Sequence, residues 1–146
     1  MGGVTKVSRA KAVQLWDELA RAHNTMTAAI EKDMVAAGMP LGWHDVLQHL
    51  RRAPDGSLRF QDLAKVEGIS DSGASRRIDQ MIKAGLIERR SCPTDRRGVF
   101  AQITAKGESE FRRAHIVFVR SLERNFGSQL EPGEADVVSG ALSRLA

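Results

Sequence analysis

Serine, arginine and glutamine side chains recur at helical spacing in residues 70–80, and proteins use these side chains to hydrogen-bond nucleic acid. Arginine can bond guanine through two hydrogen bonds and glutamine can bond adenine, whereas serine hydroxyls more often contact phosphate. At about 100° per residue, the residues opposite the apolar stripe of the same segment are Ser72, Arg76, Asp79, Gln80 and Lys83, with Gly73, Ser75 and Arg77 on its flanks. The pattern predicts an amphipathic helix whose outward face can approach a polyanion closely.

A second basic group follows at Asp95-Arg96-Arg97-Gly98, between two strand-like runs at residues 86–91 and 99–104. The intervening residues favour turns, so we expect this group at the tip of a hairpin. An aspartate two residues before an arginine can hold the guanidinium in one orientation. Such a preset arginine gains from the negative potential of a narrow minor groove.

The positive charge of the chain is concentrated around these two groups. The 146 residues carry a net charge of +4 with a sequence pI of about 9.7, and the stretch from Asp71 to Gly98 holds seven basic and four acidic residues, a net +3. A global charge of this size only permits nucleic-acid binding. The more informative observation is that the positive charge lies on the predicted helix and hairpin.

Length and composition indicate one folded domain. The apolar fraction is 42% and the charged fraction 27%, which is typical of a globular protein. The single cysteine, Cys92, excludes an intramolecular disulfide and suits a reducing compartment. No apolar run approaches the roughly 20 residues that span a bilayer, and the N-terminus lacks a signal-peptide core, so we expect a cytoplasmic protein without a membrane partner.

Long helices are predicted at both ends of the chain. Ser8 can cap a helix that continues to about Ala37, roughly 45 Å at 1.5 Å per residue, which is too long for one small domain to cover. Residues 105–126 follow Thr104 as a second long helix with apolar side chains on more than one face. A last helix is predicted to begin at Leu130-Glu131-Pro132. This surplus of apolar surface predicts a partner subunit.

Shorter elements fill the middle of the chain. We expect a helix from Pro40 to Arg52, a short strand at 57–59, a two-turn helix from Phe60 to Val66 that Gly68 closes, and a helix that Ser70 caps and Gly85 ends. With the hairpin, this order is that of a winged helix-turn-helix. The predicted fold is mainly α with a small β-hairpin wing, flanked by long terminal helices.

Specific motifs in the middle of the chain resemble the MarR family of bacterial transcription regulators. They are Asp62-Leu63-Ala64, Gly68-Ile69-Ser70, Ser75–Met81, Ala84–Arg89, the wing group Asp95–Gly98, and Ile103-Thr104-Ala105-Lys106-Gly107. The resemblance implies one domain over residues 1–146, with a DNA-binding part at 40–104 and dimerisation helices at 8–38 and 105–146. It implies a homodimer on pseudo-palindromic double-stranded DNA operators, often as a repressor that a small ligand releases.

The resemblance also assigns the two wing arginines, with Arg97 inserted into the minor groove and Arg96 on phosphate. We expect Arg76 to contact a base and Ser72 a phosphate. The complete set of expected DNA-binding residues is Ser70, Ser72, Gly73, Ser75, Arg76, Arg77, Gln80, Asp95, Arg96 and Arg97.

An effector pocket is expected where the first, second and fifth helices meet. His23, Trp43 and His115 are its expected lining. The histidines of the chain, with His44 and His49 completing the set, fall on the helices that line this pocket in the family. Since no two of them have i, i+4 spacing, we do not expect a metal site.

No enzyme is predicted, because the chain lacks a glycine-rich phosphate loop, a nucleophile with a base at recognisable spacing, and a carboxylate pair. No catalytic residue and no cofactor are expected. Two alternatives remain open. One is a regulator switched by oxidation of Cys92, since nearby arginines can lower a thiol pKa. The other is a winged-helix module that binds a protein.

Overall fold

A computed structural model describes residues 7–92 and 95–146, with the side chains of residues 92–97 outside the description. In chain order the elements are α1 (Arg9–Ala36), α2 (Leu41–Arg52), β1 (Ser57–Arg59), α3 (Phe60–Glu67), α4 (Asp71–Lys83), β2 (Ile87–Cys92), β3 (Asp95–Ile103), α5 (Ala105–Asn125), the 3₁₀ turn η1 (Gly127–Gln129) and α6 (Glu134–Ser143). Helices therefore dominate, and the strands form one small antiparallel sheet in the order β1-β3-β2. The predicted fold class is confirmed.

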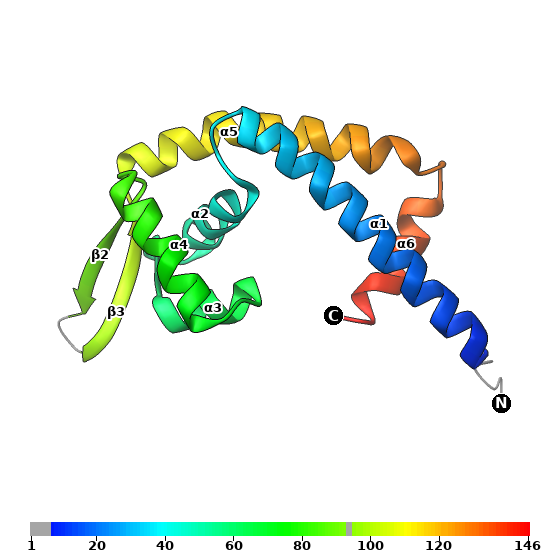
Figure 1. Cartoon of the computed structure of the whole chain (residues 1–146), viewed down its shortest axis with the longest axis horizontal. Helices are drawn as coiled ribbons and strands as arrows, with labels where there is room; N and C mark the ends of the chain where they lie inside the picture. The colour runs from blue at the N-terminus through cyan, green and yellow to red at the C-terminus, as the bar shows by residue number, and fades with distance from the viewer. Residues whose placement is uncertain (1–6, 93–94) are drawn as a thin grey trace.

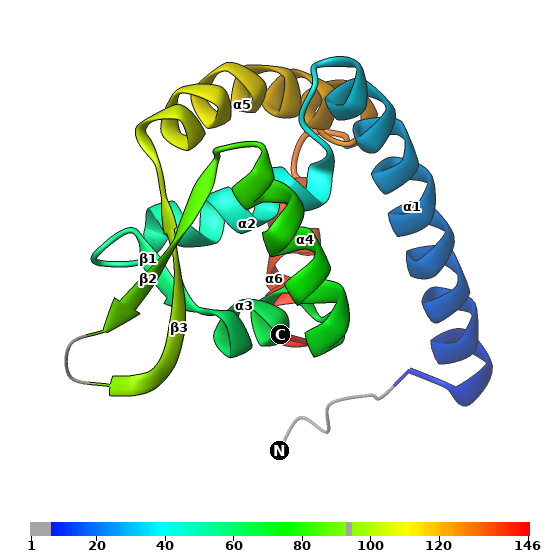
Figure 2. The ribbon, with the colours of Figure 1, turned by 60° about the vertical axis from the view of Figure 1, so that its left-hand side comes forward.

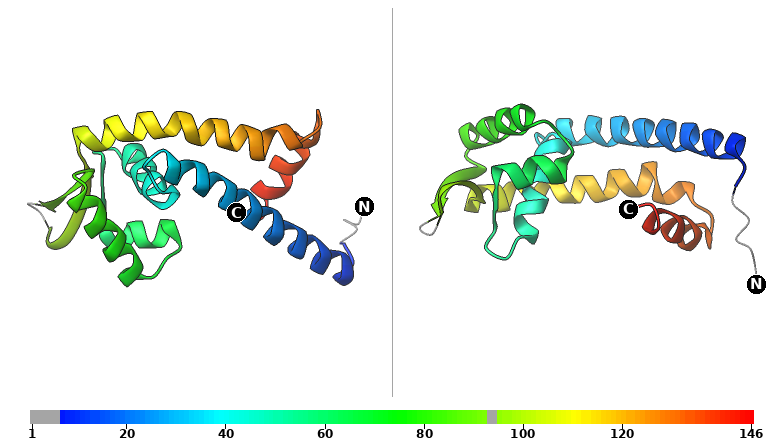
Figure 3. Two further views of the ribbon diagram at one scale, coloured as in Figure 1. Left: turned by 45° about the horizontal axis from the view of Figure 1, so that its top comes forward. Right: turned by 90° about the horizontal axis from the view of Figure 1, so that it is seen from below.

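The long helices form a frame to which the smaller elements are attached at one end. In Figure 1, α5 runs along the upper edge, with α2, α3, α4 and the hairpin beneath its first half. The N-terminal half of α1 extends away from the smaller elements, as Figure 2 also shows. The two views in Figure 3 agree that α1 and α5 come together near the C-terminal end of α1. Asp33 of α1 fixes that contact by accepting hydrogen bonds from Ser121 and Arg124 of α5.

Side-chain caps set the helix boundaries as the sequence predicts. The hydroxyls of Ser8, Ser70 and Thr104 accept backbone N–H groups three residues ahead, at the starts of α1, α4 and α5. Pro40 begins α2 without a hydroxyl, and Glu31 of α1 accepts from the Leu41 N–H instead, at 2.6 Å. The start of α2 is therefore tied to α1 by a side chain that the sequence pattern did not single out.

The core lies where α2 meets α3, α4, the sheet and the first half of α5. Its fully buried side chains include Leu47, Leu50, Leu63, Ile78, Met81, Ile87 and Phe111. Only Ile30 and Met34 of α1 are buried in this chain, whereas Trp16 is 69% exposed. Among the described residues, most of α1 is therefore not buried by apolar contacts. In the described part of the chain, no helix has the length and apolar character needed to cross a membrane.

The hairpin differs from its prediction at the tip. Asp95, Arg96, Arg97 and Gly98 belong to β3, and Cys92 pairs with Asp95, so that only residues 93–94 separate the strands. The pairing of Ser91 with Val99 shows that the extra residues form an irregularity within the ladder. The polar, turn-favouring composition of this group therefore marks a bulge in the hairpin and not its turn.

One smaller prediction is wrong. The last helix begins at Glu134, after Gly133 adopts a left-handed conformation at φ +89°, so Pro132 lies before the helix and not in its first turn. The two-turn helix predicted from Phe60 is α3, which Gly68 caps; Leu63 and Ala64 are buried, and Val66 is 54% exposed.

One close approach joins the sheet to the long helix α5. The Thr104 hydroxyl lies 2.7 Å from the Gly85 carbonyl oxygen and 3.1 Å from that of Leu86, and it accepts the Gly107 N–H. A Cβ atom added at Gly107 would lie 2.0 Å from the Leu86 carbonyl oxygen. The first turn of α5 can therefore pack on the turn after α4 only because residue 107 has no side chain.

We expect Gly107→Ala to lower the free energy of unfolding by about 1–3 kcal/mol, because the methyl group would overlap a backbone carbonyl that cannot rotate aside. Urea denaturation monitored by circular dichroism measures this change. Gly127→Ala is the matched control, since nothing lies within 4 Å of its added Cβ. Equal stability of the two variants would contradict the close-packing argument.

Candidate nucleic-acid interface

The exposed face of α4 carries the polar side chains that the sequence placed there. Ser72, Ser75, Arg76 and Gln80 are exposed. On the opposite face, Ala74, Ile78 and Met81 are buried against the core. Since the buried stripe fixes the rotation of the helix, the four polar side chains are held outward together. This face is the first part of the candidate site.

The start of α4 is compact and well capped. The Ser70 hydroxyl accepts the Gly73 N–H at 3.1 Å and lies 3.2 Å from the Ser72 hydroxyl. A Cβ at Gly73 would lie 3.1 Å from the Ser70 hydroxyl oxygen, so glycine suits this turn. Ser70 and Gly73 shape a helix N-terminus, whose free N–H groups and dipole favour an anion such as phosphate.

The adjacent arginines of α4 have different environments. Arg76 is exposed, and within the described residues no carboxylate pairs with it. Arg77 is half-buried and donates to the Glu67 carboxylate at 2.6 Å. The sequence pattern places Arg76 on the outward face and Arg77 on its flank, and both are expected to contact DNA. The structure keeps Arg76 outward and gives Arg77 a partner at the end of α3.

A carboxylate on the outward face has its own partner. Asp79 would repel phosphate, but Arg89 of β2 donates to it at 2.5 Å and reduces the local negative charge. The sequence pattern placed Asp79 on the outward face, but neither Asp79 nor Arg89 was among the expected DNA-binding residues. An acidic residue on an otherwise basic helix face is a signal that could have pointed to such a pair.

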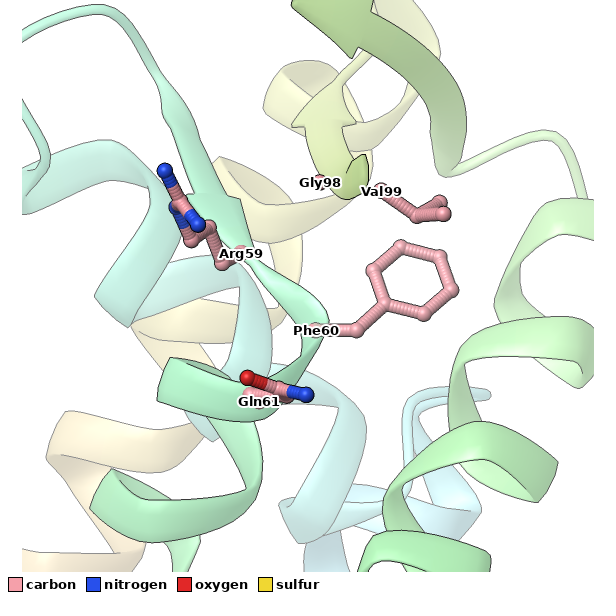
Figure 4. A pocket seen from close by; sticks show the side chains of 5 residues that line it. All are labelled: Arg59, Phe60, Gln61, Gly98 and Val99. Atoms are coloured by element: carbon pink, nitrogen blue, oxygen red, sulfur yellow. The ribbon is translucent and has the colours of Figure 1, made fainter. Parts of the chain in front are cut away.

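The same arginine connects the hairpin to α3. The Arg89 guanidinium lies over the Phe60 ring, 5.6 Å from its centre. Figure 4 shows the Phe60 ring directed toward Val99 of β3, with the Arg59 side chain on the opposite side. Phe60, Gly98 and Val99 line one small pocket between α3 and the outer part of β3. The orientation of the hairpin relative to α3 and α4 is therefore set by packing as well as by strand pairing.

The wing residues of the prediction are placed by their backbone alone. Asp95, Arg96 and Arg97 lie in β3 beside the exposed end of β2, while their side chains lie outside the described residues, as does that of Cys92. Nearby, Arg90 of β2 donates to Gln102 of β3 at 3.2 Å across the ladder. Arg89 of β2 contacts Asp79 on the outward face of α4. The hairpin and this face of α4 are therefore neighbouring parts of one surface.

The residues expected in an effector pocket do not form one group. His23 is exposed near the middle of α1, whereas Trp43 packs against the core from α2. His115 of α5 lies 3.0 Å from His44 of α2, between ring nitrogens. Among the described residues, His115 is the one expected pocket residue that contacts another histidine. Its partner, His44, was not among the residues expected to line the pocket.

His44 is the centre of an aromatic stack that the sequence did not reveal. It is fully buried, and its ring stacks on Phe111, His115 and Phe118 of α5 at centre distances of 4.4–5.3 Å. Burial lowers the pKa of His115, and the nearby His44 and Arg51 lower it further. The stack ties α2 to α5, and its environment favours the uncharged state of His115.

The arrangement of α2, α3, α4 and the β2–β3 hairpin defines a winged helix-turn-helix protein. A model described as the MarR family matches residues 37–98, which include α2 to α4 and most of the hairpin. The chain is similar to AbsC, a MarR family transcriptional regulator from Streptomyces coelicolor, with a TM-score of 0.84 and 28% identity over 97% of this chain and 95% of that one. The chain is therefore similar to MarR family transcription regulators, in its fold and over its winged helix-turn-helix segment.

Two further likenesses bear on the site. Sco3205 of Streptomyces coelicolor, a MarR family regulator solved in complex with DNA, shares the fold with a TM-score of 0.84 and 24% identity, over 99% of this chain and 91% of that one. YfiV of Bacillus subtilis, an HTH-type transcriptional regulator, is 33% identical over 95 residues, which are 62% of this chain. The chain covers 56% and 62% of the length of two curated relatives that it matches.

The lowered pKa of His115 predicts a pH dependence of stability. Because the unfolded chain takes up a proton near pH 6.5 before the folded state does, the free energy of unfolding should fall as pH drops below about 6.5. His115→Phe, which keeps a ring in the stack, should weaken this dependence between pH 7.5 and 5.5. Urea titrations at both pH values measure this change, with His23→Gln as the exposed control. If the free energy of unfolding of His115→Phe depends on pH as strongly as that of the wild type, His115 is not the cause.

Proposed function

We propose that this chain is a sequence-specific DNA-binding transcription regulator. The exposed row of Ser72, Ser75, Arg76 and Gln80 carries the proposal, because it combines donors for bases and phosphates on a helix fixed by a buried stripe. Sco3205, which shares the fold, was solved with DNA bound. In this proposal α4 enters the major groove, and the hairpin carrying Arg96 and Arg97 reaches the adjacent minor groove.

The proposed active form is a homodimer on a pseudo-palindromic operator. Apolar side chains on the terminal helices support it, because they remain exposed in the single chain; they include Val13, Trp16, Ile116, Val119, Val137 and Leu145. Exposed apolar surface rimmed by polar residues is typical of a subunit interface. Two copies of α4 would then read half-sites about one helical turn apart.

Regulation by release of DNA is the remaining part of the proposal. A repressor acts by occupying its operator, and a small ligand would end that occupancy by moving the reading helices relative to the dimerisation helices. The contact of His44 with His115 lies where α2 meets α5, so a ligand bound there would act on both sets of helices. The family resemblance, and not a measured ligand, supports this step.

The DNA-binding proposal predicts that one inverted-repeat motif is enriched when the wild-type protein selects from a genomic DNA pool at fixed salt. Arg76→Ala should weaken binding to that motif by about 1–3 kcal/mol, because a bidentate base contact is lost. Arg112→Ala is the control, since it makes the same change of net charge on the exposed side of α5. No enrichment with the wild type would refute DNA reading and favour the alternative of a protein partner.

The dimer proposal predicts that Trp16→Asp converts the protein to a monomer, because a charge replaces an indole that is 69% exposed in the single chain. Sedimentation velocity measures the mass directly. The variant should also lose binding to a two-half-site operator while its helix content by circular dichroism is retained. A wild type that sediments as a monomer, or a variant that still dimerises through this surface, would argue against the proposal.

The Cys92→Ser variant tests the alternative that oxidation of Cys92 regulates DNA binding. If oxidation of Cys92 is the trigger, peroxide should release wild-type protein from its operator and leave the variant bound. We expect equal responses of the two proteins, because the proposal assigns Cys92 no role. A peroxide response confined to the wild type would favour the redox regulator.

A further inference from the structure

Three helices of the reading part meet at one buried carboxylate. The Glu67 side chain, at the end of α3, is 6% exposed. One carboxylate oxygen accepts from the Arg77 guanidinium of α4 at 2.6 Å, and the other lies 3.4 Å from the Nε2 atom of His49 of α2. A single side chain therefore connects α2, α3 and α4.

The energetics of this carboxylate favour keeping its arginine. Burial raises the pKa of Glu67 and the charge of Asp45 raises it further, whereas Arg77 lowers it through its charge and hydrogen bond. A buried charge without a partner is strongly unfavourable. Removing Arg77 would leave the carboxylate facing Asp45 with only the half-exposed His49 to compensate.

The backbone of α2 is shaped to receive the same arginine. A Cβ atom added at Gly42 would lie 2.7 Å from the Cζ atom of Arg77 and 2.9–3.0 Å from its terminal nitrogens. The guanidinium therefore occupies the space that a side chain at residue 42 would need. Gly42 lies in a helix, where glycine is otherwise unfavourable relative to alanine, so the contact offers a reason for it.

This geometry distinguishes Arg77 from its neighbour in sequence. Arg76 is exposed on the outward face of α4, while Arg77 is directed toward α2 and α3 and is 29% exposed. An arginine held by a buried carboxylate and seated on a glycine backbone is fixed in place. Such a group sets the position of the helix that carries it.

We propose that Arg77 is a positioning residue, which locks the recognition helix α4 onto α2 and α3 through Glu67 and Gly42, and that it does not contact DNA. The inference rests on the proposed function, in which α4 reads the major groove. Groups that read bases must be held to within about 0.5 Å by supporting contacts. The lock supplies such support for Arg76 and Gln80, whose own side chains are exposed.

The competing interpretation is that Arg77 leaves Glu67 and bonds a phosphate when DNA binds. The two interpretations predict opposite signs for one variant. If Glu67 positions α4 through Arg77, then Glu67→Gln weakens operator binding. If Glu67 only competes with DNA for Arg77, then Glu67→Gln releases the arginine and strengthens operator binding.

The salt dependence of operator binding provides the second measurement. Each phosphate contact contributes about 0.9 to the slope of log K against log salt concentration. We expect Arg77→Ala to weaken operator binding at least tenfold (order of magnitude of one lost supporting contact) while leaving this slope unchanged. A slope lowered by about one in Arg77→Ala, together with tighter binding by Glu67→Gln, would overturn the proposal.

Gly42→Ala tests the lock without removing any charged group. The added methyl group should displace the Arg77 guanidinium and weaken operator binding, although alanine is the better helix former. In an Arg77→Ala background the same change should no longer weaken binding, because the space is vacant. Additive effects of the two substitutions would overturn the proposal.

A cycle of unfolding free energies separates this proposal from the proposed function. If the wild type binds no DNA, the proposed function is refuted. The free energies of unfolding of Gly42→Ala, Arg77→Ala and the double variant still measure the contact of Arg77 with Gly42. We expect Gly42→Ala to destabilise the wild type and to stabilise the Arg77→Ala protein. The same effect in both backgrounds would overturn the lock whatever the protein binds. Gly127→Ala is the control, because its Cβ meets nothing within 4 Å.

Discussion

The contact between the first turn of α5 and the turn after α4 holds the two parts of this molecule together. Gly107 lies against the Leu86 carbonyl, and Thr104 both caps α5 and bonds the carbonyls that end α4. The recognition helix α4 is therefore connected to the long helix α5 through a short, closely packed contact. Any change in the direction of α5 would be transmitted to α4 and the hairpin through this joint.

A second connection joins the two parts through α2. His44 stacks among the rings of α5, and Glu31 of α1 caps the start of α2. On its other side α2 contributes His49 and the Gly42 backbone to the cluster around Glu67. One helix thus contacts the aromatic stack at α5 and the proposed lock on α4. A ligand or subunit movement that shifts α2 would reach the recognition helix by this path, in the proposed regulatory mechanism.

The polar outward face of α4 and the exposed apolar surface of the terminal helices have different physical causes. Arg76 and the serines of α4 face outward because Ala74, Ile78 and Met81 are buried on the opposite side. The exposed apolar residues of α1 and α6 have no such partner in the chain, which is the reason for proposing a second copy. Charge on the outward face is also balanced locally, since Arg89 compensates Asp79, while no carboxylate among the described residues pairs with Arg76.

Local chemistry in the sequence determined the elements, the caps and the outward row on α4, because a hydroxyl before a helix and a 3.6-residue apolar period act over only a few residues. It also supported the resemblance to the MarR family through motifs that include Gly107. The tertiary structure decided which arginine is free, since Arg77 turns inward only because Glu67 and Gly42, which are 10 and 35 positions away, come together there. The His44 stack likewise joins chain segments that are far apart in the sequence, and no local pattern specifies it.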